Sequence, residues 1–156
     1  MAESETYRER AKRIIESNNY MVLSTCDKKG SPWACTVLFV HDDDYNFYFQ
    51  SAVDSRHALN LSENPRIAFV IFDSTQDIGS TDSIQAEGKV ALVGEKEIKG
   101  VISIYTKKVF KGNNLYAERQ YVPGNYLGAA EFRFFKIKVE RLFTNTGPGR
   151  RSEVDL

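Results

Sequence analysis

Residues 51–72 read SAVDSRHALNLSENPRIAFVIF and combine a short helix with an apolar strand. Asp54 and Ser55 are both favoured N-cap residues, and Pro65 disfavours helix in the residue before it, so a short helix is predicted between Ser55 and Pro65. Residues 66–72 are apolar at nearly every position, which is typical of a strand that is covered on both faces. This strand is therefore predicted to lie in the centre of a sheet.

Five other segments are rich in β-branched and aromatic residues and are bounded by turn residues, as strands are. They are residues 20–26, 33–42, 45–51, 83–94 and 131–145. The turn residues between the first three of these segments predict a three-stranded meander. Gly88 lies inside a long segment and predicts a bulge or a bend, and long bent strands are typical of a barrel.

Helices are predicted outside these strands. Residues 5–17 have apolar residues at helical spacing, and Thr6 and Glu9 are in position for a capping box. Residues 95–110 also have one apolar helical face, and a further short helix is predicted near residues 115–120. Six mostly antiparallel strands with peripheral helices predict an α+β fold built on a small barrel.

The composition bounds the class of protein. The chain has 156 residues, 42% of them hydrophobic, which fits one domain with a sizeable core. Its 21 Lys and Arg residues balance 21 Asp and Glu residues, so no basic face for nucleic acid is expected. The N-terminus is polar, and no apolar run approaches the roughly 18 residues of a membrane span, so a cytoplasmic protein is expected. Cys26 and Cys35 are expected to be buried, reduced thiols.

Arg56 and His57 open the predicted helix, where positive charge is unfavourable. A helix N-terminus carries roughly half a positive charge, so an Arg there costs about 0.3–1 kcal/mol unless an anion is near. The free N–H groups of such a terminus bind phosphate, and an Arg adds a bidentate donor. The alternative is a surface ion pair between Arg56 and Asp54 or Glu63, and the spacing leaves both interpretations open.

Other kinds of site fit these residues less well. Two histidines and no Cys-x-x-Cys pair argue against zinc. The three aspartates at 42–44 lack the pattern of an EF-hand, so a solvated hairpin turn is expected there. The sequence has no Gly-x-Ser-x-Gly, Gly-x-Gly-x-x-Gly or Walker motif, which argues against a hydrolase elbow and against both common phosphate loops.

The run PWACTVLFVHDDDYNFYFQSAVDSRHALNLSENPRIAFVIF, followed by IQAEGKVALV, resembles the pyridoxamine 5'-phosphate oxidase-like, FMN-binding split-barrel flavoproteins. The match covers about residues 20–95. The Trp-Ala-Cys step at 33–35 and the segment FTNTGPGR are similar to the YhbP-like branch of that superfamily. The resemblance implies one six-stranded split-barrel domain over residues 1–156, with an N-terminal helix in 1–19 and a flexible tail at 146–156. It also implies a homodimer with FMN in the interface.

The resemblance assigns the FMN phosphate to the start of the short helix. Ser55, Arg56 and His57 would hold the phosphate as the family's Ser-Arg-Lys-type triplet does. Gln50 and Ser51 would reach the phosphate or the ribityl chain from the end of the preceding strand.

The resemblance assigns the isoalloxazine ring to the strand at 33–42. Cys35, Thr36, Val37 and Leu38 would line one side of the ring. Ser83 falls where relatives carry a polar residue near the flavin from the neighbouring chain.

The sequence departs from the oxidase at cationic positions. Cys35 replaces an Arg that binds the FMN phosphate, and Val40 replaces a Lys at the end of the same strand. His57 replaces the usual Lys and is largely neutral at pH 7 unless a phosphate raises its pKa. Weaker FMN binding than in the oxidase is therefore expected.

The resemblance implies an FMN-binding flavoprotein, and we expect a flavin-dependent oxidoreductase of an unknown small-molecule substrate. The oxidase's C-terminal Arg-x-His segment has no counterpart, so pyridoxine phosphate oxidation itself is not expected. One alternative is the same barrel binding the deazaflavin F420, or heme with His41 or His57 as axial ligand. Another is a cofactor-free stress or binding protein.

Overall fold

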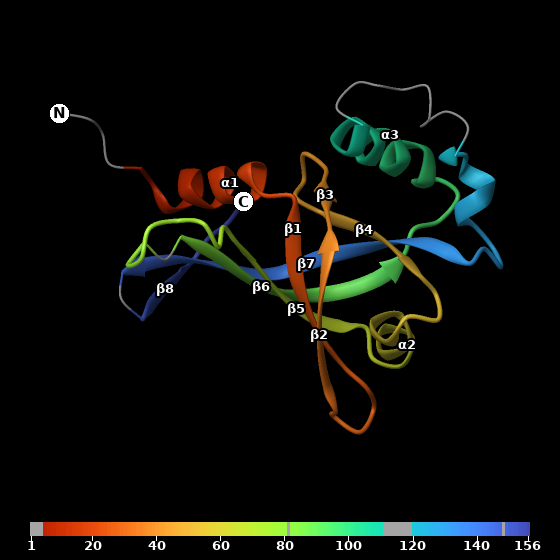
Figure 1. Cartoon of the computed structure of the whole chain (residues 1–156), viewed down its shortest axis with the longest axis horizontal. Coiled ribbons are helices and arrows are strands. Elements are labelled where there is room, and N and C mark those ends of the chain that lie inside the picture. The colour runs from red at the N-terminus through yellow and green to blue at the C-terminus, as the bar shows by residue number, and fades with distance from the viewer. Residues whose placement is uncertain (1–4, 81, 111–119, 148) are drawn as a thin grey trace.

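The computed structural model describes residues 5–80, 82–110, 120–147 and 149–156 (Figure 1). Its strands are β1 (Tyr20–Cys26), β2 (Pro32–Leu38), β3 (Val40–His41), β4 (Phe47–Ala52), β5 (Arg66–Phe72), β6 (Ser83–Leu92), β7 (Phe132–Gly147) and β8 (Arg150–Glu153). Its helices are α1 (Tyr7–Ser17), α2 (Arg56–Glu63), α3 (Ile98–Phe110) and the short 3-10 helix η1 (Pro123–Tyr126). No helix among these residues is long and apolar enough to cross a membrane.

The strands form one curled sheet (Figure 1). The pairing order is β2-β1-β5-β6-β7-β4-β3, β8 pairs with β7, and each of these ladders is antiparallel. β2 and β4 approach each other without a ladder between them. The predicted α+β class and the antiparallel split barrel are therefore confirmed.

Apolar side chains are buried on both faces of β4. Phe49 belongs to the larger core cluster, in which α1 and α2 cover the inner face of the sheet. Tyr48 belongs to a second cluster with residues of α3, η1 and β7, such as Tyr105 and Phe134. Because side chains alternate along a strand, successive residues of β4 face different surroundings.

Gly88 is the bend that the sequence predicts. The β6–β7 register shifts between Glu87 and Gly88. A Cβ atom at Gly88 would lie 2.3 Å from the carbonyl oxygen of Lys138, so the two backbones approach too closely for any side chain. The predicted long strand with a bulge or bend at Gly88 is thus confirmed as a register shift at that residue.

The predicted strand at 33–42 is two strands. Phe39 separates β2 from β3; its side chain is fully buried, and its N–H donates to the carbonyl of Asn19 at 3.1 Å. β2 pairs with β1, whereas β3 pairs with β4. The predicted three-stranded meander is therefore wrong, because the chain passes from one edge of the sheet to the other at Phe39.

Two further predictions are corrected. The tail at 146–156 was expected to be loose, but β8 pairs with β7, and Val154 and Leu156 pack on the larger core cluster. Residues 66–72 are central, as predicted, but in this chain only one face of β5 is buried. Its other face carries Phe72, which is 45% exposed, because none of the helices in the described residues packs there.

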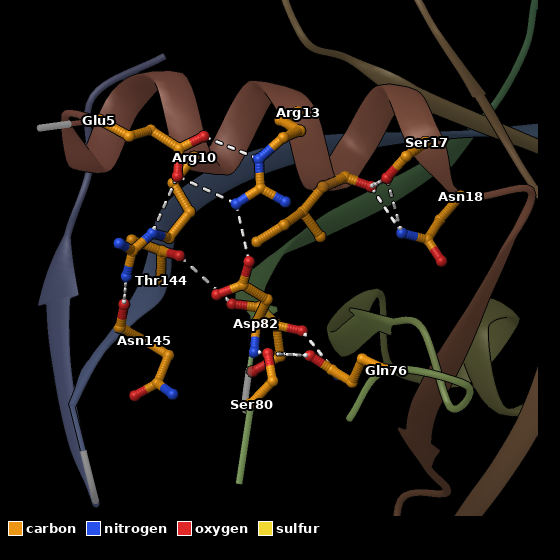
Figure 2. A network of polar contacts seen from close by, with 12 residues as sticks. Glu5, Arg10, Arg13, Ser17, Asn18, Gln76, Ser80, Asp82, Thr144 and Asn145 are labelled. Atoms are coloured by element: carbon orange, nitrogen blue, oxygen red, sulfur yellow. Dashed lines mark hydrogen bonds and ion pairs between the residues drawn. The ribbon is translucent and has the colours of Figure 1, made fainter. Parts of the chain in front are cut away.

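The N-terminal helix begins and ends close to its predicted bounds. The Thr6–Glu9 capping box is present, which satisfies N–H groups at the start of α1. Arg13 pairs with Glu5 and with Asp82, so α1 is fixed to the segment that precedes β6 (Figure 2). The predicted helix near 115–120 falls almost entirely outside the described residues.

The hairpin turn at 42–44 is present as predicted. The N–H of Tyr45 donates to the carbonyl of Asp42 at 3.1 Å. The Asp42 carboxylate accepts hydrogen bonds from the N–H groups of Asp44 and Asn46 and from the hydroxyl of Tyr48. The carboxylate is thus used by the turn itself, and the described residues contain no cluster that could hold a metal ion.

Candidate cofactor site

The start of α2 is fixed by its N-cap. Ser55 has an extended backbone, and its hydroxyl accepts from the N–H of Ala58 at 3.4 Å. The same hydroxyl donates to the carbonyl of Ala52, the last residue of β4, at 2.8 Å. The end of β4 and the beginning of α2 are thus joined through one serine, as the sequence predicts.

Three polar side chains meet at this junction. The Nε2 atom of His57 lies 2.7 Å from the hydroxyl of Ser51 and 3.2 Å from the hydroxyl of Ser55, and the two hydroxyls are 3.2 Å apart. Burial lowers the pKa of His57, so its imidazole is neutral at pH 7. We call Ser51, Ser55 and His57 the Ser–His cluster.

Buried groups hold α2 against β1. Ala58 and Leu61 enter the larger core cluster. The side-chain amide of Asn60 is buried and donates to the hydroxyl of Thr25 at 3.0 Å. These contacts fix the position of α2 relative to β1, and therefore the position of the N–H groups at the start of α2.

Arg56 lies in the first turn of α2, and its side chain extends to β2. Its guanidinium lies over the ring of Trp33 of β2, 4.4 Å from the ring centroid. Within the described residues Arg56 forms no ion pair, so the alternative of a surface pair with Asp54 or Glu63 is not formed. Stacking on an aromatic ring leaves the edges of a guanidinium available to a ligand.

Arg133 is a residue that the sequence analysis missed. It is directly opposite Ser51 in the β4–β7 ladder. Its Nε atom is buried and has no hydrogen-bond partner in the part of the chain that the structure describes. A signal existed, because Arg133 has the same parity as Phe135 and Ile137, and a cation is out of place on a core-facing side.

Gln50 is separated from the Ser–His cluster. It is next to Ser51 in β4 and therefore points to the other face, where it hydrogen-bonds to the hydroxyl of Tyr126 in the second core cluster. Burial raises the pKa of Tyr126 to about 12. The structure does not bring Gln50 and Ser51 to one point, and the role of Gln50 stays a prediction.

The predicted ring-binding residues lie on β2, which is an edge strand in the pairing order. Cys35 and Val37 face the larger core cluster, and burial raises the pKa of the Cys35 thiol. Thr36 faces outward and lines a groove of about 420 Å³ together with Val70 and Phe72. Leu38 is partly buried against the second core cluster. Both cysteines are free, as expected, but they are only partly buried.

Ser83 is distant from these residues within one chain. It pairs with Phe72 on β5, and β5 and β1 lie between β6 and β2. Three strand spacings place it about 14 Å from β2. Within one chain Ser83 therefore does not adjoin the residues of β2, and its approach to a flavin from a neighbouring chain stays a prediction.

The Ser–His cluster could also be considered as a catalytic dyad. A nucleophilic serine needs a histidine base, and the base is usually oriented by a third group. Among the described residues no carboxylate hydrogen-bonds to His57. The Ser51 hydroxyl, an imidazole and a helix N-terminus instead match the donors that hold a phosphate group, and the unpaired Nε of Arg133, a residue opposite Ser51, fits an anion.

Solved structures share this fold. A heme binding protein from Mycobacterium smegmatis has a TM-score of 0.75 at 19% identity, over 97% of this chain and 58% of that one. The heme storage protein of Vibrio cholerae has a TM-score of 0.69 at 19% identity, over 90% of this chain and 96% of that one.

Curated relatives match part of the chain. A pyridoxine/pyridoxamine 5'-phosphate oxidase of Ehrlichia ruminantium is 32% identical over 91 residues, which are 58% of this chain and 45% of the relative. The enzyme of the same name from Cupriavidus necator is 37% identical over 79 residues, which are 51% of this chain and 35% of the relative. The chain thus spans less than half the length of these relatives. The model of the family described as pyridoxamine 5'-phosphate oxidase matches residues 7–145. The chain therefore belongs to the pyridoxamine 5'-phosphate oxidase family.

Proposed function

We propose that this protein binds FMN and is a flavin-dependent oxidoreductase that acts on a small molecule. The observation that carries the proposal is the Ser–His cluster at the N-terminus of α2, in a chain of this family. When bound, FMN would supply the electron or hydride transfer. The residues of the chain would bind and orient it, and none of them needs to act as an acid or a base.

The phosphate would be held by the start of α2. The hydroxyl of Ser51 can donate to a phosphate group, whereas the hydroxyl of Ser55, 3.2 Å away, already donates to the carbonyl of Ala52 and fixes the turn. The N–H groups of the first turn of α2 add donors and a favourable dipole. Arg56 would add a charged donor, while its stacking on Trp33 keeps the guanidinium in place.

The ring would lie along β2, with a second copy of the chain completing the site. The outer face of the sheet carries Tyr20 and Phe72, which are 59% and 45% exposed, beside the groove that Thr36 lines. Exposed apolar patches of this kind are typical of interfaces. In a cytoplasmic homodimer, this face would be covered and Ser83 of one chain would approach the flavin of the other.

Substitution of Arg56 tests the phosphate assignment. We expect Arg56→Ala to weaken FMN binding by about 1.5–3 kcal/mol, because a charged hydrogen bond is lost. Quenching of FMN fluorescence on titration measures the affinity, and Lys29→Ala, in the exposed β1–β2 turn, is the control. Unchanged affinity in Arg56→Ala would show that Arg56 does not hold the phosphate, and a wild-type chain that does not bind FMN would overturn the function.

Heme is a second candidate, favoured by His41. The Nδ1 atom of His41 contacts the carbonyl of Asp42 at 3.0 Å, and among the described residues its Nε2 atom has no partner. Neutral imidazole nitrogens ligate heme iron. A Soret band that forms with hemin and is lost in His41→Ala, with no response to FMN, would favour heme. A spectrum typical of F420 in the purified protein would favour the deazaflavin alternative. No response to FMN, heme or F420 would favour a cofactor-free stress or binding protein.

A further inference from the structure

We propose that Arg133 is a second cationic ligand of the anion bound at the start of α2. This inference rests on the proposed function and extends it, because it gives the site a charge that the Ser-Arg-His triplet does not contain. Three properties of Arg133 support it: its place in the sheet, its unused donors, and the charge balance of the site.

The sheet register places Arg133 beside the Ser–His cluster. Residues directly opposite in an antiparallel ladder have Cβ atoms about 4.5–5.5 Å apart, and Arg133 is opposite Ser51. Phe49 and Phe135, one pair further along the same face, stack with ring centroids 5.0 Å apart. His57 lies over this face, 6.2 Å from the Phe49 ring and in contact with Ser51. The Arg133 side chain therefore starts next to the cluster, on the face that α2 covers.

The guanidinium of Arg133 has donors without acceptors. Within the part of the chain that the structure describes, its guanidinium donates one hydrogen bond, from Nη1 to the carbonyl of Gly128. Its Nε atom is buried without a partner, and no acidic residue pairs with Arg133 among the described residues. A buried donor left unpaired costs about 1–3 kcal/mol. The Nε edge of a guanidinium is suited to the bidentate binding of an oxyanion, so a phosphate that displaces the groups covering Nε would remove this cost.

The charge balance also favours a second cation. A phosphate monoester carries about −1.5 to −2 charges at pH 7. The two hydroxyls of the cluster are neutral, and burial keeps His57 neutral as well. Arg56 alone would leave the anion undercompensated, whereas Arg56 and Arg133 together match it.

Substitution of Arg133 tests the inference with two flavins. Arg133→Gln removes the charge, and Arg133→Lys keeps the charge but removes the fork. We expect Arg133→Gln to weaken FMN binding about ten- to a hundredfold, with a smaller loss in Arg133→Lys, and to leave the affinity for riboflavin, which has no phosphate, unchanged. Arg141→Gln is the matched control on the same strand, because Arg141 pairs with Glu153 at the surface. Equal losses for FMN and riboflavin, or no loss for FMN, would overturn the inference.

The stability of the ligand-free protein separates a binding role from a structural one. If the unpaired Nε is a cost, the midpoint of thermal unfolding of Arg133→Met without ligand should equal or exceed that of the wild type. A large drop in that midpoint would instead show that Arg133 supports the fold. Inorganic phosphate should raise the midpoint of the wild type but not of Arg133→Gln. This readout remains valid if the wild type binds no flavin, which would overturn the proposed function without deciding the inference.

Discussion

The two ends of β7 differ in whether the arginine side chains near them have partners within the chain. At the Asn145 end, Arg13 pairs with Glu5 at 2.7 Å and with Asp82 at 2.7 Å, and Arg10 donates to the carbonyl of Asn145 at 3.0 Å (Figure 2). At the other end, Arg133 has a buried donor without a partner among the described residues.

The difference separates architecture from binding. Around α1 the chain supplies both members of each ion pair, so the network is complete without a ligand and fixes α1 to the segment before β6. Around α2 the chain supplies cations, hydroxyls and helix N–H groups, but no acid for Arg56 or Arg133 among the described residues. A site that is complete without a ligand is expected to stabilise the fold, and an incomplete one is expected to bind.

The largest effect is expected at Gly88, where β6 pairs closely with the middle of β7. Gly88→Val would place side-chain atoms against the Lys138 carbonyl, which is backbone and cannot move away. We expect a loss of about 3 kcal/mol in the free energy of unfolding, measured by urea denaturation. Both ends of β7 should be perturbed together, since β6 pairs with β7 from Phe135 to Thr144 on both sides of Gly88.

Gly100→Ala is the control for that change. Gly100 lies in the exposed part of α3 with open space around its Cβ position, so alanine should stabilise the protein by about 0.5–1 kcal/mol. A Gly88→Val protein as stable as the wild type would show that β6 and β7 can separate at the bulge. The two ends of β7 would then not be connected by a rigid ladder.

The next effect is expected at the anchor of α2. Asn60→Ala removes the buried hydrogen bond from the Asn60 amide to the Thr25 hydroxyl and leaves that hydroxyl without this donor. We expect the free energy of unfolding to fall by about 1–3 kcal/mol. FMN affinity should fall as well, because the N-terminus of α2 is then no longer held in a fixed position against β1. Ser62→Ala, on the exposed side of α2, should change neither quantity. If hydrogen exchange of α1 also accelerates in Asn60→Ala, the two ends are not independent.

Local chemistry made part of this site predictable from the sequence. The serine cap and the proline stop delimit α2 within a few residues, so Ser55, Arg56 and His57 could be placed at a helix start before any contact was known. Gly88 could be identified in the same way, because a glycine inside a strand signals a close approach of two backbones.

The other parts of the site and of the fold depend on long-range strand pairing and could not be predicted from the sequence. The partner of Ser51 is Arg133, which is distant in the sequence, and only the register of β4 on β7 brings them together. The break at Phe39 depends on how the sheet curls, and β8 depends on two apolar side chains in a charged tail. Periodicity within one segment contains none of this information.

A smaller effect is expected from pH. The pKa of His57 lies below its ordinary 6.5 in the free protein because of burial, and a bound phosphate would raise it. Between these two pKa values FMN binding takes up a proton, so affinity should increase as pH falls, by at most about tenfold per pH unit. The charged side chains nearest to His57 in the chain and in the sheet register are those of Arg56 and Arg133. Titrations from pH 8 to 6.5 avoid protonation of the phosphate itself, whose pKa is about 6.

His57→Gln provides the comparison for the pH series. Its FMN affinity should be nearly independent of pH over the same range, because no other group of the Ser–His cluster titrates. Without ligand the sign is opposite: the stability that neutral His57 contributes to the wild type is lost as pH falls from 6.5 through its lower folded pKa. A wild-type affinity that is flat with pH would place His57 outside the phosphate site.

The smallest effect is expected in the network that is already complete. Glu5→Gln, Arg13→Gln and the double variant form a cycle, and exposed pairs of this kind typically couple by about 0.2–1 kcal/mol. The hydrogen bond from Arg13 lowers the pKa of Glu5 below 4.5, so the coupling should be present above that pH and disappear as pH falls through the lower folded value. It should also weaken in high salt, because both side chains are exposed to screening. FMN affinity should be the same in all four proteins. If Arg13→Gln weakens FMN binding, the α1 network also positions Ser83, which directly follows its Asp82, and the two ends of β7 act on one site.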